Sequence, residues 1–169
     1  DFPYILTHKY GEAGSVLYDL FIKLFQKLSF AARIPGEVLF LHGGPTRRVL
    51  EARSFEEAFT IGYPCVDDAV LEEVLWSDPV NGITEPFTPS PRGAGVLYGE
   101  AVTLKTLELA RVKYIVRGHE AVNGFKLDHK RRVATIFSAK YVYGLSRASY
   151  MIVEKRKNTS NLTELVKLF

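Results

Sequence analysis

The stretch Val38-Leu39-Phe40-Leu41-His42-Gly43-Gly44 gives the first indication of the fold. Four consecutive apolar residues, placed after the helix-stopping pair Pro35-Gly36, predict a short buried strand that ends at His42. The stretch Tyr114-Ile115-Val116-Arg117-Gly118-His119 has the same layout further along the chain. Because ligands in α/β proteins bind at the carboxyl edge of the sheet, two such strands predict a site at that edge.

Each of the two histidines is compatible with two roles. Imidazole suits zinc, iron and manganese, and the neighbouring glycines Gly43, Gly44 and Gly118 leave room for backbone or ligand to approach closely. A strand-end histidine whose nitrogens are simply satisfied by hydrogen bonds fits the same pattern. The residues alone leave both roles open for His42 and His119.

The segments around these strands predict further helices and strands. Ser15 opens an amphipathic helix, a second helix starts at Asp67 or Asp68 and ends near Trp76, and a third spans Glu100 to Ala110. Strand-like runs cover residues 121–127, 133–138 and 148–154, and a capping-box spacing of Asn161 and Glu164 predicts a short terminal helix. The apolar face of the first helix is Leu17, Leu20, Phe21, Leu24, Phe25 and Leu28. The order of elements predicts a layered α/β fold with sheets inside and helices outside.

A long loop from Ser77 to Gly99 contains four of the eight prolines and carries Arg92 in Ser90-Pro91-Arg92-Gly93-Ala94-Gly95. Loops this long inside compact domains are usually functional or disordered. The flanking residues expose the guanidinium of Arg92, which can contact phosphate oxygens in pairs; a solvated loop arginine is the alternative. Asp78 before Pro79 is either a turn residue or part of a site.

Composition narrows the class of protein. The chain has 169 residues, of which 47% are hydrophobic and 24% charged, and this suits one globular domain. No apolar run reaches the roughly 20 residues that a membrane span needs. The single cysteine, Cys65, favours a reducing cytosol. The net charge of +3 fits an anionic substrate and does not argue for nucleic acid.

Several residues have an ordinary structural interpretation. We expect Trp76 in the core and His129 at the surface. The basic cluster Lys126, Lys130, Arg131 and Arg132 is most simply a solvated hairpin turn. Residue 1 is not Met, so we expect a chain cut from something longer or processed. Few Gln, Asn, Cys and Met residues beside plentiful Lys, Arg and Glu are a pattern found in thermophiles.

Five motifs in one order make the pattern much more specific. They are Leu-Phe-Leu-His-Gly-Gly (39–44), Leu-Trp-Ser-Asp-Pro (75–79), Ser-Pro-Arg-Gly-Ala-Gly (90–95), Arg-Gly-His (117–119) and Thr-Ile-Phe-Ser-Ala (135–139). Over about residues 5–154 the chain resembles the C-terminal half of serine/threonine phosphoprotein phosphatases, within the calcineurin-like metallophosphoesterases. The resemblance implies the C-terminal portion of a β-sandwich flanked by helices, here residues 1–154, followed by a polar tail at 155–169 with a short helix.

The resemblance also implies roles for matching residues. His42 and His119 would be ligands of one of two metal ions (Mn, Fe or Zn), Arg92 would clamp the substrate phosphate, and Asp78 would line or support the site. In the family, a metal-bridged hydroxide attacks phosphorus, and metal ions and arginines neutralise the developing charge. The implied substrates are phosphoserine and phosphothreonine on proteins in the cytoplasm, with regulatory subunits left unspecified.

Departures from the family pattern are informative. The family's Asp-x-His, Asp-Arg-Gly and Gly-Asn-His-Glu motifs, which supply the remaining ligands, a second arginine and the histidine acid, do not occur in this sequence. We therefore predict that this chain alone is not a competent phosphatase. After Phe137-Ser138-Ala139 the family has Pro-Asn-Tyr, whereas this chain has Lys140-Tyr141-Val142-Tyr143. Tyr141 or Tyr143 would replace the substrate-facing tyrosine, and Lys140 would add a phosphate contact.

Two other functions remain open at this point. One is a phosphoesterase of the same superfamily that acts on small molecules such as dinucleoside polyphosphates. The other is a catalytically inactive binding module that keeps the fold. The strings around Arg92 and Asp78 favour the protein phosphatases over the small-molecule enzymes.

Overall fold

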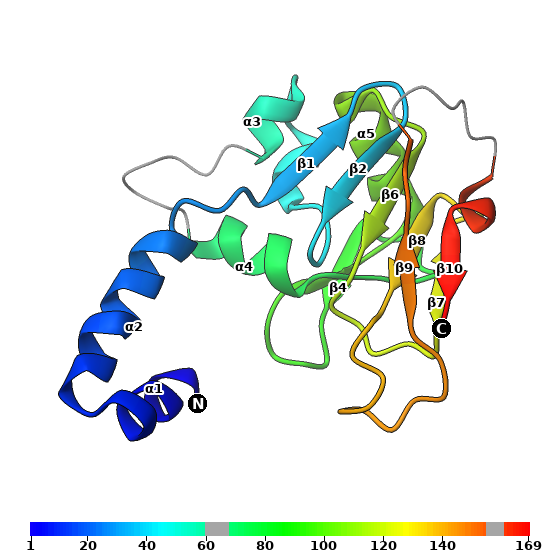
Figure 1. The fold of residues 1–169 in the computed structure, drawn as a ribbon. Coiled ribbons are helices and arrows are strands. Elements are labelled where there is room, and N and C mark those ends of the chain that lie inside the picture. Colours follow the sequence, from blue (N-terminus) through cyan, green and yellow to red (C-terminus); the bar gives the residue numbers. More distant parts are fainter. Residues whose placement is uncertain (60–67, 155–160) are drawn as a thin grey trace.

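A five-stranded mixed sheet forms the centre of the computed structural model, which describes residues 1–59, 68–154 and 161–169. Its order is β1-β2-β6-β8-β7 (Figure 1). The three inner strands β2, β6 and β8 run parallel, and β1 and β7 pair antiparallel at the two edges. The strands are β1 (Ala31–Ile34), β2 (Val38–Leu41), β6 (Tyr114–Arg117), β7 (Phe125–Asp128) and β8 (Val133–Ile136).

Two smaller sheets accompany the central one. A three-stranded sheet has the order β3-β5-β4, and a two-stranded sheet pairs β10 with β9. The bounds are β3 (Asp78–Pro79), β4 (Phe87–Pro89), β5 (Val96–Tyr98), β9 (Ser149–Met151) and β10 (Val166–Leu168). The expectation of an unstructured loop from Ser77 to Gly99 is therefore wrong. Strands of two or three residues are defined by pairing with each other and leave little local pattern in the sequence.

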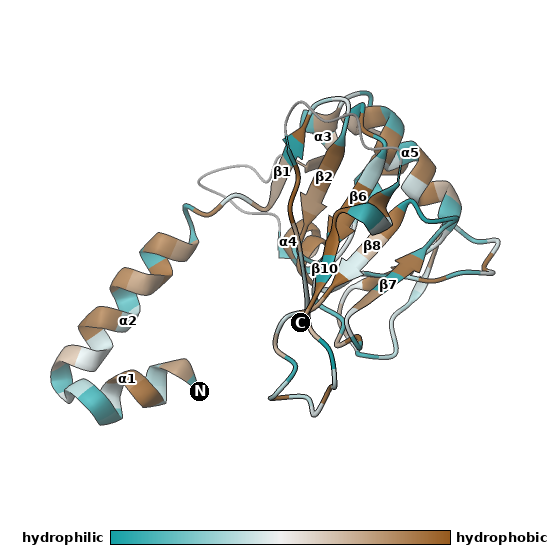
Figure 2. Ribbon diagram, turned by 45° about the vertical axis from the view of Figure 1, so that its right-hand side comes forward, coloured by the Kyte–Doolittle hydropathy of each residue, from teal (hydrophilic) through white to brown (hydrophobic). Residues whose placement is uncertain are grey.

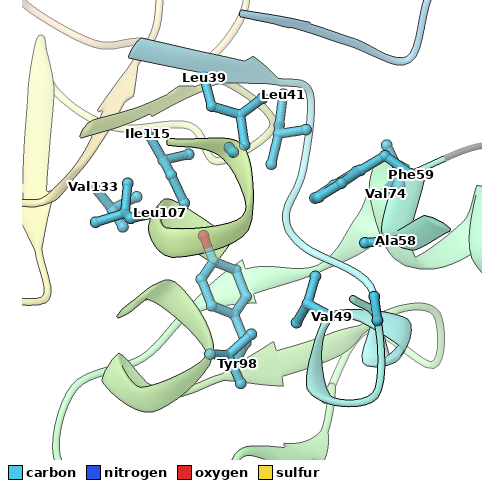
Figure 3. Close-up of a cluster of buried hydrophobic side chains, with 13 residues drawn as sticks. Leu39, Leu41, Val49, Ala58, Phe59, Val74, Tyr98, Leu107, Ile115 and Val133 are labelled. Carbon is cyan, nitrogen blue, oxygen red and sulfur yellow. The ribbon is translucent and has the colours of Figure 1, made fainter. Parts of the chain in front are cut away.

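The main hydrophobic core lies between the central sheet and the short helices (Figure 3). Leu39, Ile115 and Val133 come from the three parallel strands, and Val74 and Leu107 come from helices. The near-continuous apolar runs of β2 and β6 fit parallel strands that are buried on both faces. The helices are α1 (Phe2–Tyr10), α2 (Glu12–Phe25), α3 (Phe55–Phe59), α4 (Asp68–Trp76) and α5 (Glu100–Ala110), with 3₁₀ turns η1 (Arg47–Leu50) and η2 (Leu162–Glu164).

Helices α1 and α2 form a hairpin that extends away from the rest of the molecule (Figures 1 and 2). The two helices contact each other through Phe2, whose ring lies 5.0 Å from that of Phe21. Leu20, Leu24 and Leu28 on the predicted apolar face are 55%, 52% and 55% exposed. The helix begins at Glu12 after Gly11, three residues before the predicted Ser15, and its apolar face does not contribute to the core.

Helix α5 and strand β2 have their predicted bounds, and the runs predicted at 121–127, 133–138 and 148–154 overlap the shorter strands β7, β8 and β9. Helix α4 begins at Asp68, and Asp67 lies outside the described residues. Asn161 accepts a hydrogen bond from the Thr163 N–H (3.1 Å) at the start of η2, a 3₁₀ turn in place of the predicted α-helix. In the described ranges, no helix is long and apolar enough to cross a membrane.

Candidate functional site

The fold brings His42 and His119 together at the carboxyl ends of β2 and β6, as the sequence predicts. Their ring centroids are 5.4 Å apart, with an interplanar angle of 64°. The Gly118 N–H donates a hydrogen bond to the His42 carbonyl (3.1 Å), which joins the two strand ends directly. The rings of Trp76 and His119 meet in a T-shaped contact, with their centroids 5.2 Å apart. Trp76 is 44% exposed, so it borders the site and the core assignment is wrong.

Both imidazoles are held in a state suited to binding a cation. Burial lowers the pKa of His42, and the charge of Arg117 adds to this effect. Burial also lowers the pKa of His119, although the carboxylate of Asp78 acts in the opposite direction. Among the described residues, the buried Nε2 of His119 has no hydrogen-bond partner, and Asp78 Oδ1 is 4.0 Å away. A neutral imidazole with an unshared nitrogen is the form that binds a metal.

Asp78 is a buried carboxylate placed between two arginines. Its Oδ1 lies 2.7 Å from Arg117 Nη2, and its Oδ2 lies 3.0 Å from Arg92 Nε. The parallel pairing of β3 with β5 fixes its position. Asp78 is therefore a member of the site and more than a turn residue before proline.

The sequence prediction did not include Arg117, which is the most connected charge in the site. Its side chain is fully buried. Besides Asp78 it donates to the carbonyls of Gly43 (2.7 Å) and Ser77 (3.2 Å) and to Glu120 Oε2 (2.7 Å). The sequence did contain one indication of this role. Arg117 ends an apolar strand, and an arginine that is buried there must be paired with acceptors.

The end of α4 holds the two loops that carry His42 and Arg92. The N–H groups of Gly43 and Gly44 donate to the Val74 carbonyl at 2.8 and 3.2 Å. Gly95 has φ +63°, and a Cβ there would lie 2.5 Å from the carbonyl carbon of Trp76. Glycine is needed at Gly43 and Gly95 because backbone approaches backbone. At Gly118, by contrast, a Cβ would meet its nearest atom at 3.9 Å, so close approach does not explain that glycine.

Lys140, Tyr141 and Tyr143, the candidates that follow Ala139, make their contacts away from this cluster among the described residues. Tyr141 is 87% exposed, and Tyr143 packs its ring edge against Phe137. The ammonium of Lys140 lies over the rings of Tyr141 and Phe169. Within the described part of the chain, the contacts of these side chains are with one another and with neighbouring aromatics. A substrate-facing role for Lys140, Tyr141 or Tyr143 stays a prediction.

His129 is buried, so its assignment to the surface is wrong. Its Nδ1 lies 2.7 Å from the Thr103 hydroxyl and its Nε2 lies 3.0 Å from the Val80 carbonyl. Its backbone N–H donates to the Asn81 side chain (3.1 Å). His129 thus connects the β7–β8 turn to the loop after β3. An isolated histidine in a charged turn carries no sequence signal of burial.

The donors at the candidate site fit a metal only in part. His42 and His119 supply two imidazoles, which suit Mn, Fe or Zn. Both Asp78 oxygens, however, are already paired with arginines. Among residues 1–59, 68–154 and 161–169, no group of three or more His, Cys, Asp or Glu side chains is arranged to hold a metal ion. Two imidazoles alone are fewer donors than protein metal sites usually provide.

Similarity to known proteins agrees with this geometry. Residues 3–123 match the calcineurin-like phosphoesterases. The chain is 32% identical over 158 residues to the serine/threonine-protein phosphatase 6 catalytic subunit of Drosophila melanogaster, covering 88% of this chain and 50% of that protein. It is 31% identical over 134 residues to a protein phosphatase 2A catalytic subunit of Dictyostelium discoideum, covering 78% of this chain and 41% of that protein.

A solved structure shares the fold. It is a protein serine/threonine phosphatase from Saccharomyces cerevisiae with similarity to human phosphatase PP5, with a TM-score of 0.75 and 23% identity. The match covers 99% of this chain and 54% of that one. The expected mixed α/β fold is confirmed, and the chain spans half or less of the length of the two curated relatives described above.

Proposed function

Because the chain belongs to the calcineurin-like phosphoesterase family, we propose that it forms one side of the active site of a protein serine/threonine phosphatase. The proposed substrates are phosphoserine and phosphothreonine in proteins, as the names of the relatives suggest. In this proposal Arg92 binds the substrate phosphate, Asp78 positions Arg92, and His42 and His119 are metal ligands.

The placement of Arg92 is the observation that carries the proposal. Asp78 engages the Nε of Arg92 (3.0 Å). The Nη atoms therefore remain available to two oxygens of one phosphoryl group, the paired contact that arginine makes best. Arg117 is buried and bound to the other Asp78 oxygen, so it fixes the carboxylate that orients Arg92.

Metal ions, when bound, would neutralise charge on the phosphoryl group and lower the pKa of water. His42 and His119 would hold one of them, and we propose manganese, iron or zinc, with manganese as the first ion to test. This chain would contribute both imidazoles to metal binding, and their lowered pKa values favour the neutral form that binds a metal. Further ligands are needed for a dinuclear site.

Three finer assignments belong to the same proposal. Tyr141 or Tyr143 would replace the family's substrate-facing tyrosine, and Lys140 would add a contact to the phosphate. Residues 1–154 would form the catalytic part and residues 155–169 a tail; residues 155–160 of that tail lie outside the described part of the chain. The single cysteine favours a cytoplasmic location.

The experiment compares binding with turnover on the purified 169-residue chain. We expect it to bind a phosphoserine peptide more tightly than the unphosphorylated peptide, and Arg92→Gln to remove most of that preference. Arg53→Gln, which removes an exposed arginine elsewhere, is the control and should leave the preference intact. If Arg92→Gln and Arg53→Gln behave alike, the role of Arg92 is wrong.

A turnover measurement tests whether this chain alone forms a complete active site. With manganese added, we expect no robust hydrolysis of the phosphopeptide by this chain alone, because its donors for a dinuclear site are two imidazoles. Robust manganese-dependent hydrolysis would refute this expectation. A dinucleoside polyphosphate tested in parallel distinguishes the small-molecule alternative.

A catalytically inactive binding module is the second candidate. It is favoured by the pairing of both Asp78 oxygens with arginines, which leaves the described residues without a carboxylate ligand near the two histidines. This candidate predicts that manganese binding measured by calorimetry is absent, and that phosphopeptide binding is independent of added metal.

A further inference from the structure

A cavity lined by basic side chains lies at the opposite edge of the central sheet from His42 and His119. Its volume is about 610 Å³. It is built where β6 and β8 begin and α5 ends, whereas the candidate active site lies where β2 and β6 end. Four basic side chains line it, together with apolar residues of the core edge: Lys113, Lys130, Arg131, Arg132, Leu107, Val112 and Leu162.

The cations around this cavity outnumber the carboxylates that pair with them among the described residues. Lys130 and Arg132 share one carboxylate, Glu100, at 3.1 and 3.2 Å. Lys113 pairs with Glu37 at 3.3 Å. Among the described residues, Lys130 and Arg132 therefore share a single carboxylate, and the lining carries more positive than negative charge.

Arg131 has uncharged partners among the described residues. It donates to the Thr163 hydroxyl (2.6 Å) and to Asn161 Oδ1 (3.4 Å). These contacts hold the guanidinium at the rim without neutralising it. An exposed, positioned arginine with its charge uncompensated is suited to an anion.

The backbone of the turn is held in a conformation that these residues rarely adopt. His129, Lys130 and Arg131 have φ values of 49°, 54° and 66° in succession. Left-handed non-glycine residues cost free energy and occur where the surrounding structure enforces them, often at ligand sites. Here the buried His129 ring, bound to Thr103 and to the Val80 carbonyl, enforces the turn. The backbone that carries Lys130 and Arg131 is therefore fixed before any ligand arrives.

We propose that this cavity binds a phosphate-bearing anion of two or more negative charges, at a site separate from the candidate active site. Arg131 and Arg132 would pair with phosphate oxygens, and Lys130 would add a point charge. The apolar wall of Leu107, Val112 and Leu162 would contact the organic part of the ligand. The ligand is either a free phosphorylated compound or a phosphoryl group on a polypeptide.

The test uses the 169-residue chain and inorganic pyrophosphate, with binding measured by calorimetry at low ionic strength. We expect saturable binding that includes an Arg131-dependent site, whose Kd rises about tenfold in Arg131→Gln because a charge-assisted hydrogen bond is lost. Lys130→Gln, a second exposed position, should weaken binding in the same direction. Circular dichroism checks that each variant keeps its fold.

Two control variants distinguish binding in this cavity from other causes of pyrophosphate binding. Arg147→Gln removes the same charge from an exposed position outside the cavity and should change Kd less than about twofold, within the scatter expected for screened surface charges. Arg92→Gln removes the candidate phosphate clamp and should leave the Arg131-dependent site intact. The proposal is overturned if pyrophosphate does not saturate, if Arg147→Gln weakens binding as much as Arg131→Gln, or if only Arg92→Gln abolishes it.

A phosphoserine peptide identifies the source of the anion. Arg131-dependent binding that is tighter for the peptide than for pyrophosphate assigns the cavity to phosphorylated polypeptides. Arg131-dependent binding that is tighter for pyrophosphate assigns it to free phosphorylated compounds. Either result supports an anion site; a peptide preference that disappears with Arg92→Gln alone belongs to the candidate active site.

Discussion

At the scale of single residues, Asp78 holds the candidate site together through Arg92 and the buried Arg117. We predict that Asp78→Asn lowers the free energy of unfolding by about 3 kcal/mol, because it leaves the buried guanidinium of Arg117 without one of its two paired carboxylates. Urea denaturation measures this loss. Asp19→Asn, at an exposed helix position, should change it by less than about 0.5 kcal/mol. Equal midpoints for Asp78→Asn and the wild type would contradict the assignment.

Tyr98, the fully buried tyrosine of β5, gives a prediction about pH. Burial raises the pKa of its hydroxyl above the usual 10.0, so the folded state keeps a proton that the unfolded chain loses. Its contribution to stability is complete below pH 10 and falls as pH rises, by about 1.4 kcal/mol per unit above that point.

Tyr98→Phe tests this prediction by unfolding at pH 9 and pH 11. The variant should lose less stability between the two values than the wild type. At pH 9 it should be about as stable as the wild type, because the hydroxyl has no hydrogen-bond partner among the described residues. An identical pH dependence in the two proteins would show that Tyr98 ionises normally.

Residue chemistry also marks the limit of sequence-based inference. A histidine at the end of a strand and an arginine between proline and glycine can be recognised from a few neighbouring residues. The sequence therefore indicated His42, His119 and Arg92. Arg117 and His129 were missed because their burial depends on partners 39 and 26 residues away in the chain. No local pattern encodes such a distance.

At the scale of elements, the turn between β4 and β5 positions Arg92. Two glycines in this turn share a left-handed conformation but differ in their surroundings, so they can be compared directly. Gly93 and Gly95 both have positive φ, at 76° and 63°. A Cβ at Gly93 meets nothing within 4 Å, whereas one at Gly95 would lie 2.5 Å from Trp76 backbone. We predict that Gly93→Ala costs about 1 kcal/mol of unfolding free energy and Gly95→Ala clearly more. Thermal unfolding of the two variants measures these costs. Equal losses of stability would contradict the close packing around Gly95.

The same elements explain which parts of the fold were predictable. β2 and β6 are apolar runs bounded by glycine, so their existence and type follow from local sequence. The edge strand β1, Ala-Ala-Arg-Ile, has no such run and exists because β2 offers it an antiparallel partner. Helix α5 was predicted with its observed bounds, because Gly99 and Glu100 mark its start clearly.

At the scale of the whole molecule, the α1–α2 hairpin presents a large apolar face to solvent (Figure 2). Exposed apolar side chains gathered on one helical hairpin favour association. We predict that the purified chain self-associates, and that the double variant Leu20→Glu, Leu24→Glu shifts it toward monomer without loss of thermal stability. Sedimentation velocity measures the shift.

The control for the hairpin is Lys23→Glu, which changes the net charge by the same amount on the same helix. It should leave the association state unchanged, since Lys23 is not part of the apolar face. If Lys23→Glu dissociates the protein as effectively as the double variant, charge repulsion and not the apolar face is the cause.

Helix α4 has a wider consequence through its last turn. The Val74 carbonyl receives the backbone of the loop after β2, and Trp76 lies against Gly95 in the turn that carries Arg92. A displacement of this one helix end would move the imidazole and the guanidinium in concert. The helix end is therefore a shared support for both loops, and a partner that binds α4 would alter the proposed phosphate site without touching either side chain.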